Sequence, residues 1–517
     1  MQLDLNDKFR QALALMEESD KSLFITGRAG TGKSTLLQYF RDHTSKDIVV
    51  LAPTGVAAVN VAGVTIHSFF GFKPDITIEK AWALGHKVKK PELFLELDAI
   101  VIDEISMVRA DLLDCIDAFL RRITGSTRAF GGKQLIMFGD LYQLPPVVTG
   151  EEREIFRSRY NSPFFFSSDS ISRLNFDYIE LDQIYRQSDP SFIEILNAVR
   201  SRMVTDAHLT LLNARVNPDY APPPEEYTVH LTGTNRDAEI YNQMMLESLP
   251  GEQFSFNADS SGNFDKKAEP APNQLTVKSG AQIMLTHNDR GGAYINGTVG
   301  RIERIDTDQH GTPIIDVALQ SGKVVEITPH TWEMFSFTYN SHKKRIETDV
   351  IGTYTQLPMI LAWSITVHKS QGKTFDRVII DLPRSFAHGQ TYVALSRATS
   401  LEGIILKSPL TRSHVLMDYS VVHWLTSLQY GEAHAKQPII DINKLLLKAI
   451  SEGSSLEIEY LKSSDQKSTR VIKPESVSKQ VFKGFEFVGV YAYDQLRHDY
   501  RTFRLDRILS ARLSQDL

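Results

Sequence analysis

The sequence predicts an α/β protein with two similar parallel-sheet domains and a smaller β-rich domain at its C-terminus. Three observations lead to this prediction. Short apolar runs repeatedly precede a polar or glycine-rich turn and then a helical pattern, which is typical of parallel sheets with ligands at their strand ends. A proline-rich break at Pro218–Pro224 separates two such series. After Ile442 the pattern changes to short strand-like runs.

Length and composition agree with several domains. A chain of 517 residues, 42% of them hydrophobic, is too long for one core, so we expect at least three domains. No long stretch is free of charge, and the N-terminus has no apolar signal core, so we expect a cytoplasmic protein without a membrane partner. The single cysteine, Cys115, excludes an internal disulfide. A net charge of -6 gives no global sign of a polyanion partner. Evidence for a nucleic-acid partner must therefore come from sequence motifs.

The first domain is predicted at residues 1–205 and the second at residues 206–430. The candidate strands of the first domain are Leu23–Thr26, Ile48–Leu51, Ile100–Ile102, Leu135–Phe138 and Tyr178–Leu181. Those of the second are Val229–Leu231, Ile283–Leu285, Val378–Ile380 and Ile404–Leu406. Residues near 298–355 are rich in Thr, Val and Ile and predict a small β insertion. A polar linker at 431–441 should precede the last domain, residues 442–517.

The strongest motif runs from Gly27 to Ser34, between an apolar strand and a helical run. In this context backbone N–H groups and the helix N-terminus cradle phosphates, Lys33 reaches the terminal phosphates, and Ser34 ligates magnesium. The motif therefore predicts a site for a nucleotide and Mg²⁺. Its predicted nucleotide-binding residues are Gly27, Gly30, Thr31, Gly32, Lys33, Ser34 and Thr35.

Acidic and amide groups follow two further strands. Asp103 and Glu104 directly follow the apolar run Ala99–Ile102, so they are expected at the end of a strand. There Asp103 would hold the magnesium and Glu104 would deprotonate the attacking water. The run Leu135–Phe138 leads to Gln143, whose amide could sense the γ-phosphate. Together with the phosphate loop, these residues predict a hydrolase.

Two arginines are candidates for stabilising the charge that phosphoryl transfer develops. Arg186 lies in Tyr185–Gln187, and Arg397 follows the run Ala394–Ser396. Guanidinium groups from a neighbouring element perform this task in related chemistry. A single arginine at a helix end is usually a surface residue. The assignment of both arginines to catalysis therefore depends on their occurrence together with the other motifs.

The ordered motifs resemble superfamily-one helicases of the Pif (petite integration frequency) type. The matching segments are Ala52–Ala58, Val64–Ser68, Asp103–Met107, Phe130–Gly132, Tyr185–Gln187, Asn296–Gly300, Val367–Gly372 and Tyr392–Arg397. The segment Leu113–Ile123 is similar to the signature helix of this family, with Cys115 where lysine is more usual.

The resemblance implies two RecA-like P-loop domains with ATP between them and single-stranded DNA across both. It implies 5′-to-3′ movement, a wedge-type insertion near residues 60–95, and Gln11 and Gly372 as further nucleotide contacts. The DNA-contacting residues that it implies are Pro53, Asn60, Thr65, His67, Thr366, His368 and Lys369. Histidine and proline faces can stack on bases, while threonine and lysine contact phosphates without reading sequence.

The C-terminal segment resembles a WYL domain, through runs such as Gly484–Tyr491 and Arg501–Ile508. Phe487–Gly489 stands near the place of the Trp-Tyr-Leu run that names the family. Arg470, Arg501 and Arg504 are candidates for binding an anionic ligand. The alternative is a solvated basic face with Arg507 in a structural ion pair.

We therefore expect a monomeric, ATP-dependent DNA helicase acting on single-stranded DNA, single-strand to duplex junctions and G-quadruplex DNA. The C-terminal domain would assist DNA binding or regulation. Two alternatives are a nucleotide-switched DNA-binding protein and a translocase that separates no duplex.

Overall fold

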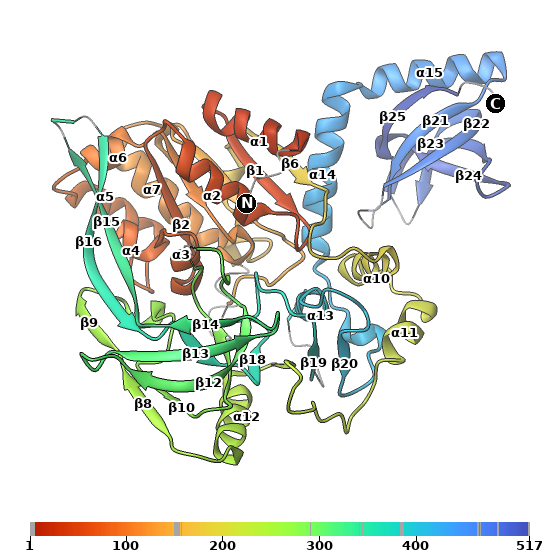
Figure 1. Ribbon diagram of the computed structural model, residues 1–517. Coiled ribbons are helices and arrows are strands. Elements are labelled where there is room, and N and C mark those ends of the chain that lie inside the picture. The colour runs from red at the N-terminus through yellow and green to blue at the C-terminus, as the bar shows by residue number, and fades with distance from the viewer. Residues whose placement is uncertain are drawn as a thin grey trace. The chain divides into compact units, whose positions relative to one another are not determined.

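The computed structural model describes residues 6–148, 156, 158–289, 291–340, 342–343, 345–382, 387–462, 465, 467–482 and 485–514. Gly484, which begins one of the predicted runs, lies outside them. The chain divides into two compact units (Figure 1), residues 1–200 with 204–416 and residues 201–203 with 417–517. The predicted α/β class is confirmed, and each unit is described by itself below.

The first parallel sheet has six strands in the order β3-β2-β4-β5-β1-β6. They are β1 (Ser22–Gly27), β2 (Ile48–Ala52), β3 (Val64–Thr65), β4 (Ala99–Ile102), β5 (Gln134–Phe138) and β6 (Phe176–Leu181). The strands β1, β4 and β5 are buried along their whole length, because helices cover both faces of a parallel sheet. All five predicted strands of this domain are confirmed.

Helices of the first domain connect these strands. They are α1 (Asp7–Glu18), α2 (Lys33–His43), α3 (Gly55–Asn60), α4 (Ile66–Phe70), α5 (Ile78–Lys87), α6 (Glu92–Glu96) and α7 (Ala110–Thr124). Cys115 is buried in α7, and burial raises the pKa of its thiol to about 12. Two short helices, α9 (Asp169–Ser172) and α10 (Pro190–Arg200), flank β6.

Residues 60–95 add the helices α4 to α6 beside α7. Their aromatic rings form one cluster with Phe119 of α7, in which the ring centroids of Phe70 and Phe119 are 5.3 Å apart. Phe69 also reaches Phe337, at 5.8 Å between centroids. Phe337 belongs to a long β-hairpin from the second half of the unit, so this helical insertion and that hairpin pack together.

The second parallel sheet has the order β18-β7-β19-β20. Its strands are β7 (Val229–Thr232), β18 (Ser364–Thr366), β19 (Val378–Ile380) and β20 (Ile404–Leu406). The prediction that Ile283–Leu285 belongs to this sheet is wrong: it forms part of β11 (Gln282–Leu285), which pairs antiparallel with two other strands. A fully buried apolar run looks the same in either type of sheet.

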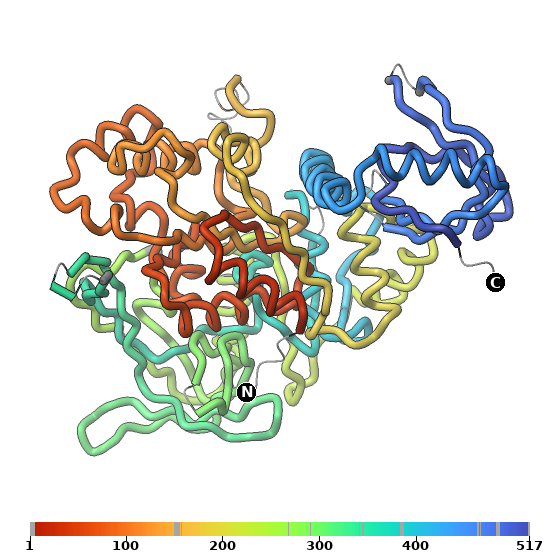
Figure 2. The backbone as a smooth tube through the Cα atoms, turned by 90° about the horizontal axis from the view of Figure 1, so that it is seen from above, coloured from red at the N-terminus to blue at the C-terminus, as the bar shows by residue number. Residues whose placement is uncertain are grey.

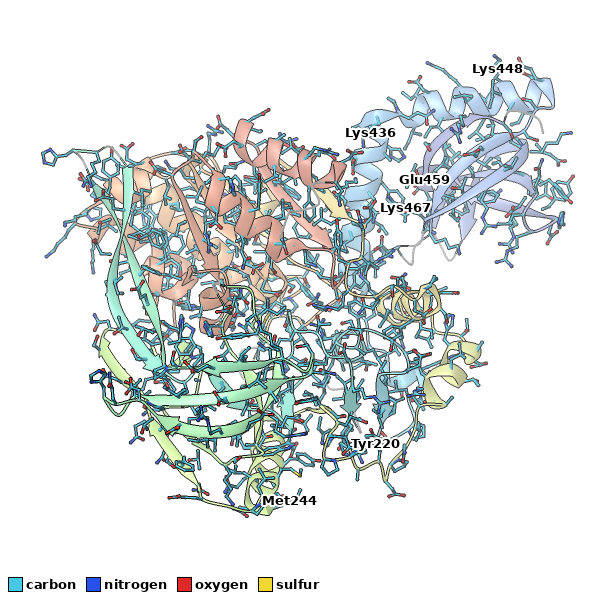
Figure 3. All side chains as sticks on the ribbon, viewed as in Figure 1. Tyr220, Met244, Lys436, Lys448, Glu459 and Lys467 are labelled. Carbon is cyan, nitrogen blue, oxygen red and sulfur yellow. The ribbon has the colours of Figure 1, made fainter. Side chains whose placement is uncertain are left out.

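Helices α11 (Asp206–Asn213), α12 (Asn235–Ser248) and α13 (Gln390–Leu395) accompany the second sheet. Tyr220 lies in the loop that leads to β7, and the exposed Met244 lies on α12 (Figure 3). Between α12 and β18 the chain forms antiparallel sheets around a separate apolar core.

These antiparallel strands extend beyond both ends of the segment near 298–355 in which the sequence indicates an insertion. They are β8 (Phe254–Asn257), β9 (Asp259–Gly262), β10 (Gln274–Val277), β11, β12 (Val299–Thr307), β13 (Pro313–Leu319), β14 (Val324–Ile327), β15 (His330–Asn340), β16 (Arg345–Gln356) and β17 (Met359–Leu361). The hairpin β15–β16 is the long pair at the left of Figure 1. Strand β8 alternates half-buried and exposed residues, and β9 is exposed throughout. Neither strand therefore shows a clear apolar pattern in the sequence.

The second unit joins two helices to one antiparallel sheet of order β24-β23-β22-β21-β25. Its elements are α14 (Tyr419–Lys436), α15 (Ile439–Glu452), β21 (Leu456–Leu461), β22 (Lys467–Phe482), β23 (Phe485–Asp494), β24 (Asp499–Arg504) and β25 (Ile508–Leu513). Residues 431–436, expected in a linker, continue α14. Strands β22 and β23 extend past their neighbours (Figure 2).

One face of this sheet packs on α15. Ile442, Leu446 and Ala449 of the helix share a core with Val490 and Ala492 of β23. Lys448 lies on the exposed side of α15, away from the sheet that carries Glu459 and Lys467 (Figure 3). Among the described residues of the whole chain, no helix combines the length and apolarity needed to cross a bilayer.

Candidate functional site

The loop Gly27–Gly32 joins β1 to α2 in a shape that requires glycine. Gly30 and Gly32 have φ angles of +81° and +82°, in the left-handed region. A Cβ at Gly30 would come within 2.5 Å of the Arg186 Cβ, and one at Gly32 within 2.9 Å of the Phe9 ring. The missing side chains let neighbouring elements close over a loop whose N–H groups and following helix suit phosphate.

Lys33 is the first residue of α2, and its side chain turns back to the loop. Its ammonium donates to the carbonyls of Gly27 at 2.7 Å and Arg28 at 3.0 Å. Burial lowers the pKa of Lys33, whereas the carboxylates of Asp140 and Glu104 oppose that shift. The ammonium therefore lies at the phosphate loop and near acidic groups.

The donor set around Lys33 fits a triphosphate with magnesium. Ser34 and Thr35 are exposed in the first turn of α2, while Thr31 is buried and donates to the Arg28 carbonyl at 2.9 Å. Magnesium prefers hydroxyl, carboxylate and phosphate oxygens. Ser34 and Asp103 offer the first two.

Asp103 and Glu104 follow β4 directly, as predicted. Burial raises the pKa of Asp103 to about 6, and burial together with the Asp103 charge raises the pKa of Glu104 to about 7. Glu104 also has a φ of +49°, a strained conformation for a residue with a side chain. A strained carboxyl that titrates near neutrality suits a general base.

Gln143 is buried and is held by Asp140, a residue to which the sequence assigned no role. The Gln143 amide donates to the Asp140 carboxylate at 3.3 Å, and Arg200 forms an ion pair with Asp140 at 3.5 Å. The Arg200 guanidinium lies 4.0 Å from the centroid of the Tyr142 ring. Asp140 could have been found from its place after β5, because neighbouring parallel strands end at the same edge.

A second residue without a predicted role, Gln371, connects the two parallel sheets. It lies in the turn after β18, and its Nε2 donates to Glu104 Oε2 at 3.0 Å and to Gln143 Oε1 at 3.1 Å. The proposed base and the proposed phosphate sensor therefore share one amide from the other sheet. The sequence signal was present, because Gln371 stands within a motif already singled out.

The predicted arginines both lie at this junction. Arg186 Nη1 donates to the Ser396 carbonyl at 3.3 Å and Nη2 to the Gly372 carbonyl at 3.1 Å. Tyr392 of α13 adds a further tie, since its hydroxyl accepts from the Ala29 N–H of the phosphate loop at 3.1 Å. Arg186 and Tyr392 thus join elements of the two sheets beside the loop.

Arg397 is only 1% exposed and is fully engaged. Its donors bind the carbonyls of Val393 at 2.8 Å, Ser370 at 3.2 Å and Lys373 at 3.3 Å, and the Ser396 hydroxyl at 2.8 Å. Burial, and then the nearby Arg186 charge, lower the pKa of Arg397 to about 9. Its guanidinium therefore holds the turn after β18 by hydrogen bonds and lies near the Arg186 charge.

Gln11 is exposed on α1, two residues and therefore about 200° around the helix from Phe9, which packs on Gly32. Gly372, the other additional nucleotide contact expected from the resemblance, is exposed and accepts from Arg186. Phe9 is thus the side chain of α1 that meets the loop.

Two Thr-x-His sequences occupy matching places on the two sheets. Thr65 ends β3 and Thr366 ends β18, the edge strands of their sheets. The Thr65 hydroxyl accepts from the Ser68 N–H, and the Thr366 hydroxyl from the Lys369 N–H, each at 3.2 Å. The half-buried His67 and His368 follow two residues later, and burial lowers the pKa of His368.

The other candidate DNA contacts lie near these strand ends. Pro53 is half-buried directly after β2, and Lys369 is exposed. Asn60 is exposed at the end of α3, and its Oδ1 accepts from Asn296 Nδ2 at 2.8 Å.

In the second unit the three candidate arginines have different surroundings. Arg470 is buried and bonds Asp494, which is 1% exposed, at 3.4 Å. Arg504 forms two hydrogen bonds with Asp506, at 3.0 and 2.6 Å. Arg501 is exposed on the α15 side of the sheet. Arg470 and Arg504 therefore have structural partners.

Family comparisons agree with this geometry. A family model described as PIF1-like helicase matches residues 4–207, one described as UvrD-like helicase C-terminal domain matches residues 361–404, and one described as WYL domain matches residues 441–513. The ATP-dependent DNA helicase Pif1 of Bdellovibrio bacteriovorus is 30% identical over 434 residues, covering 82% of this chain and 92% of the relative. The chain belongs to the PIF1-like helicase family.

Other members of the PIF1-like helicase family are similarly close. The ATP-dependent DNA helicase PIF1 of Mus musculus is 34% identical over 429 residues, which are 81% of this chain and 62% of the mouse protein. The chain thus spans about six tenths of that relative's length. The crystal structure of Bacteroides sp Pif1 in complex with ADP-AlF4 is 34% identical with a TM-score of 0.75, covering 84% of this chain and 98% of that one. The RecA-like α/β fold class and the C-terminal WYL domain are confirmed.

Proposed function

We propose that the protein is an ATP-dependent DNA helicase that moves 5′ to 3′ along single-stranded DNA and separates duplex or structured DNA. The observation that carries the proposal is the bridge from Gln371 to Glu104 and Gln143. It makes the hydrolytic centre depend on how the two sheets are placed, which a motor requires. The names of the family relatives support the same activity.

The residues divide the chemistry of hydrolysis among them. Lys33 binds the terminal phosphates of ATP, while Ser34 and Asp103 would hold Mg²⁺, which supplies positive charge to the phosphates. Glu104 accepts the proton of the attacking water, and Gln143 senses the γ-phosphate. Arg186 and Arg397 stabilise the charge that develops on the transferred group.

The DNA path runs over the strand ends of both sheets. The pairs Thr65 with His67 and Thr366 with His368 offer a hydroxyl and an aromatic ring at the edge strand of each sheet. Hydroxyls contact phosphates and rings stack on bases. Two equivalent grips on separate sheets allow stepping when ATP changes their spacing. The partners of a monomeric enzyme would be single-stranded DNA, junctions and G-quadruplexes, with residues 60–95 as the wedge.

The WYL domain contributes a further DNA-binding surface on the sheet face opposite α15. Tyr491 alternates with the buried Val490 and Ala492, so its ring lies on that outer face. The rings of Tyr491 and Tyr500 stack with centroids 5.3 Å apart and are 39% and 46% exposed. Exposed stacked rings are typical of single-strand binding platforms.

The experiment that tests the proposal is ATP turnover with and without single-stranded DNA, beside the Glu104→Gln variant. Strand displacement is then measured on duplexes with a 5′ or a 3′ single-stranded tail. We expect stimulation by DNA, no turnover in the variant, and displacement from the 5′ tail. Stimulated turnover without displacement would indicate a translocase, and turnover indifferent to DNA would indicate a nucleotide-switched binding protein.

A further inference from the structure

The turn Ser370–Lys373, which follows β18, is a rigid element between two sets of contacts. Its backbone is closed by hydrogen bonds from Ser370 N–H to the Thr366 carbonyl and from Lys373 N–H to the Ser370 carbonyl, both at 3.0 Å. Ser370 is fully buried and Arg397 binds the carbonyls of Ser370 and Lys373. A displacement at one end of this turn therefore moves the other end.

One end of the turn holds the hydrolytic centre. Gln371 Nε2 donates to Glu104 Oε2 and to Gln143 Oε1. A carboxylate oxygen that accepts from an amide is stabilised in its charged form and is a weaker proton acceptor. Glu104 in this arrangement is bonded to the other sheet rather than free to meet a water.

The other end of the turn reaches the candidate DNA path. Lys373 Nζ donates to Asn296 Oδ1 at 2.6 Å, and Asn296 Nδ2 donates to Asn60 Oδ1 at 2.8 Å. The stem of Lys373 packs on Gly297, where a Cβ would lie 3.2 Å from the Lys373 Cγ. Partial burial lowers the pKa of Lys373 to about 8, so this half-buried ammonium relies on the Asn296 oxygen as its acceptor.

Asn296 is itself fixed in position. Its backbone N–H donates to Asn288 Oδ1 at 2.8 Å, and the next N–H, of Gly297, donates to the Leu285 carbonyl of β11 at 2.8 Å. The amide of Asn296 therefore lies between an exposed residue of the first domain, Asn60, and a half-buried lysine of the second, Lys373.

We propose that the chain Asn60–Asn296–Lys373 reports the presence of single-stranded DNA to Glu104 through the Ser370–Lys373 turn. DNA that engages the Asn60 amide competes with Asn296 for it. The released Asn296 and Lys373 let the turn shift, and Gln371 leaves Glu104 free to accept the proton of the attacking water. Asn296, Lys373 and Gln371 are positioning residues in this scheme, which rests on the proposed function.

The test compares ATP turnover of wild type, Lys373→Met and Asn296→Ala over a series of poly-dT concentrations. Methionine keeps the stem of Lys373 and removes its donor. We expect both variants to raise the DNA-free rate, because loss of the bond between Lys373 and Asn296 releases the turn as DNA would. The ratio of DNA-stimulated to DNA-free turnover should therefore fall by about fivefold or more, the usual size of a coupling between two sites. Stimulation equal to wild type in both variants would overturn the proposal.

The neighbouring exposed lysine, Lys369, provides a matched control. Lys369→Met removes a charge from the same region without touching the chain, so it should raise the half-maximal DNA concentration and leave the maximal stimulation intact. A loss of maximal stimulation in Lys369→Met equal to that in Lys373→Met would contradict the assignment to Lys373.

Gln371→Ala tests the other end of the turn. Removal of its amide should raise the DNA-free rate, because Glu104 loses its restraint, and a lowered or unchanged rate would overturn the mechanism. Wild type run in parallel separates the two ideas: if it shows no stimulation by DNA, the proposed function itself fails.

Discussion

Arg186 Nη2 donates to the Gly372 carbonyl at 3.1 Å, so a side chain that follows the first sheet is bonded to a turn of the second. A guanidinium binds an ionised oxygen more strongly than a neutral carbonyl. A γ-phosphate placed at the nearby loop can therefore replace Gly372 as the partner of Arg186. This exchange provides a direct way for nucleotide to change the contact between the sheets.

The first prediction concerns Arg186→Ala. We expect kcat for ATP to fall by about 10³, the size of effect seen when a transition-state arginine is removed. Of its two carbonyl partners, Ser396 keeps a hydrogen bond from the Gln187 amide and Gly372 is exposed, so the thermal midpoint should change little. Steady-state turnover and thermal denaturation measure both quantities, with Arg128→Ala, an exposed arginine of the same domain, as control. A kcat equal to that of the control would contradict the assigned role.

The second prediction concerns Arg397→Ala, which should lower stability in addition to the rate of ATP turnover. Its guanidinium binds three backbone carbonyls inside the protein, and truncation removes all three of these hydrogen bonds. A hydrogen bond to a charged group contributes about 1.5–3 kcal/mol. Urea denaturation should show a clearly lower midpoint than that of Arg186→Ala. Equal midpoints in the two variants would show that the hydrogen bonds of Arg397 add no stability.

The local parts of the site could be predicted from the sequence, whereas the contacts between sheets could not. Lys33 and Asp103 are fixed by short-range rules: a glycine-rich turn after a strand, and an acidic residue at the next strand end. Gln371 and Glu104 are 267 positions apart, and their contact depends on how two separate sheets meet. No local pattern encodes that geometry.

The same division holds for the fold. Strands such as β1 and β5 are buried on both faces and read as continuous apolar runs. The edge strand β3 has only two residues, too few for any periodic signal, and β18 has three. Strand β8 alternates half-buried and exposed residues and β9 is exposed throughout, so both resemble loops in the sequence.

The third prediction concerns the two histidines of the proposed DNA path. Replacing His67 or His368 by alanine should weaken binding of single-stranded DNA by about 1–3 kcal/mol each, the usual value of one stacked base. Fluorescence anisotropy with a labelled poly-dT strand measures the affinity. Replacing His310, an exposed histidine in the turn after β12, should leave it unchanged. An effect of His310→Ala as large as the others would indicate general charge or folding changes.

The fourth prediction concerns the buried ion pair of the WYL domain. Asp494→Ala leaves the Arg470 charge buried without its carboxylate, which should destabilise this unit by about 3–5 kcal/mol. Asp506→Ala breaks the exposed pair with Arg504 and should cost about 1 kcal/mol or less. Limited proteolysis of the full chain, followed over increasing urea, reports the C-terminal unit. If proteolysis begins at the same urea concentration in both variants, the buried ion pair contributes no more to stability than the exposed one.

The fifth prediction concerns the aromatic face of the WYL domain. The double variant Tyr491→Ala with Tyr500→Ala should lower DNA affinity by a few-fold, because two exposed rings are lost while the α15 core is untouched. Leu496→Ala removes an apolar side chain that is more exposed than either tyrosine and is the control. If both proteins bind DNA as wild type does, this face takes no part in binding.

The buried position of Cys115 in α7 has a practical consequence for labelling the protein in solution. A thiol whose pKa is raised to about 12 is almost wholly protonated at neutral pH, and maleimide dyes react with thiolate. Since the chain has no other cysteine, new cysteines placed on exposed helices of the two sheets can be labelled as a donor and acceptor pair without replacing Cys115. Energy transfer between them would then test the proposed change in spacing between the sheets during turnover.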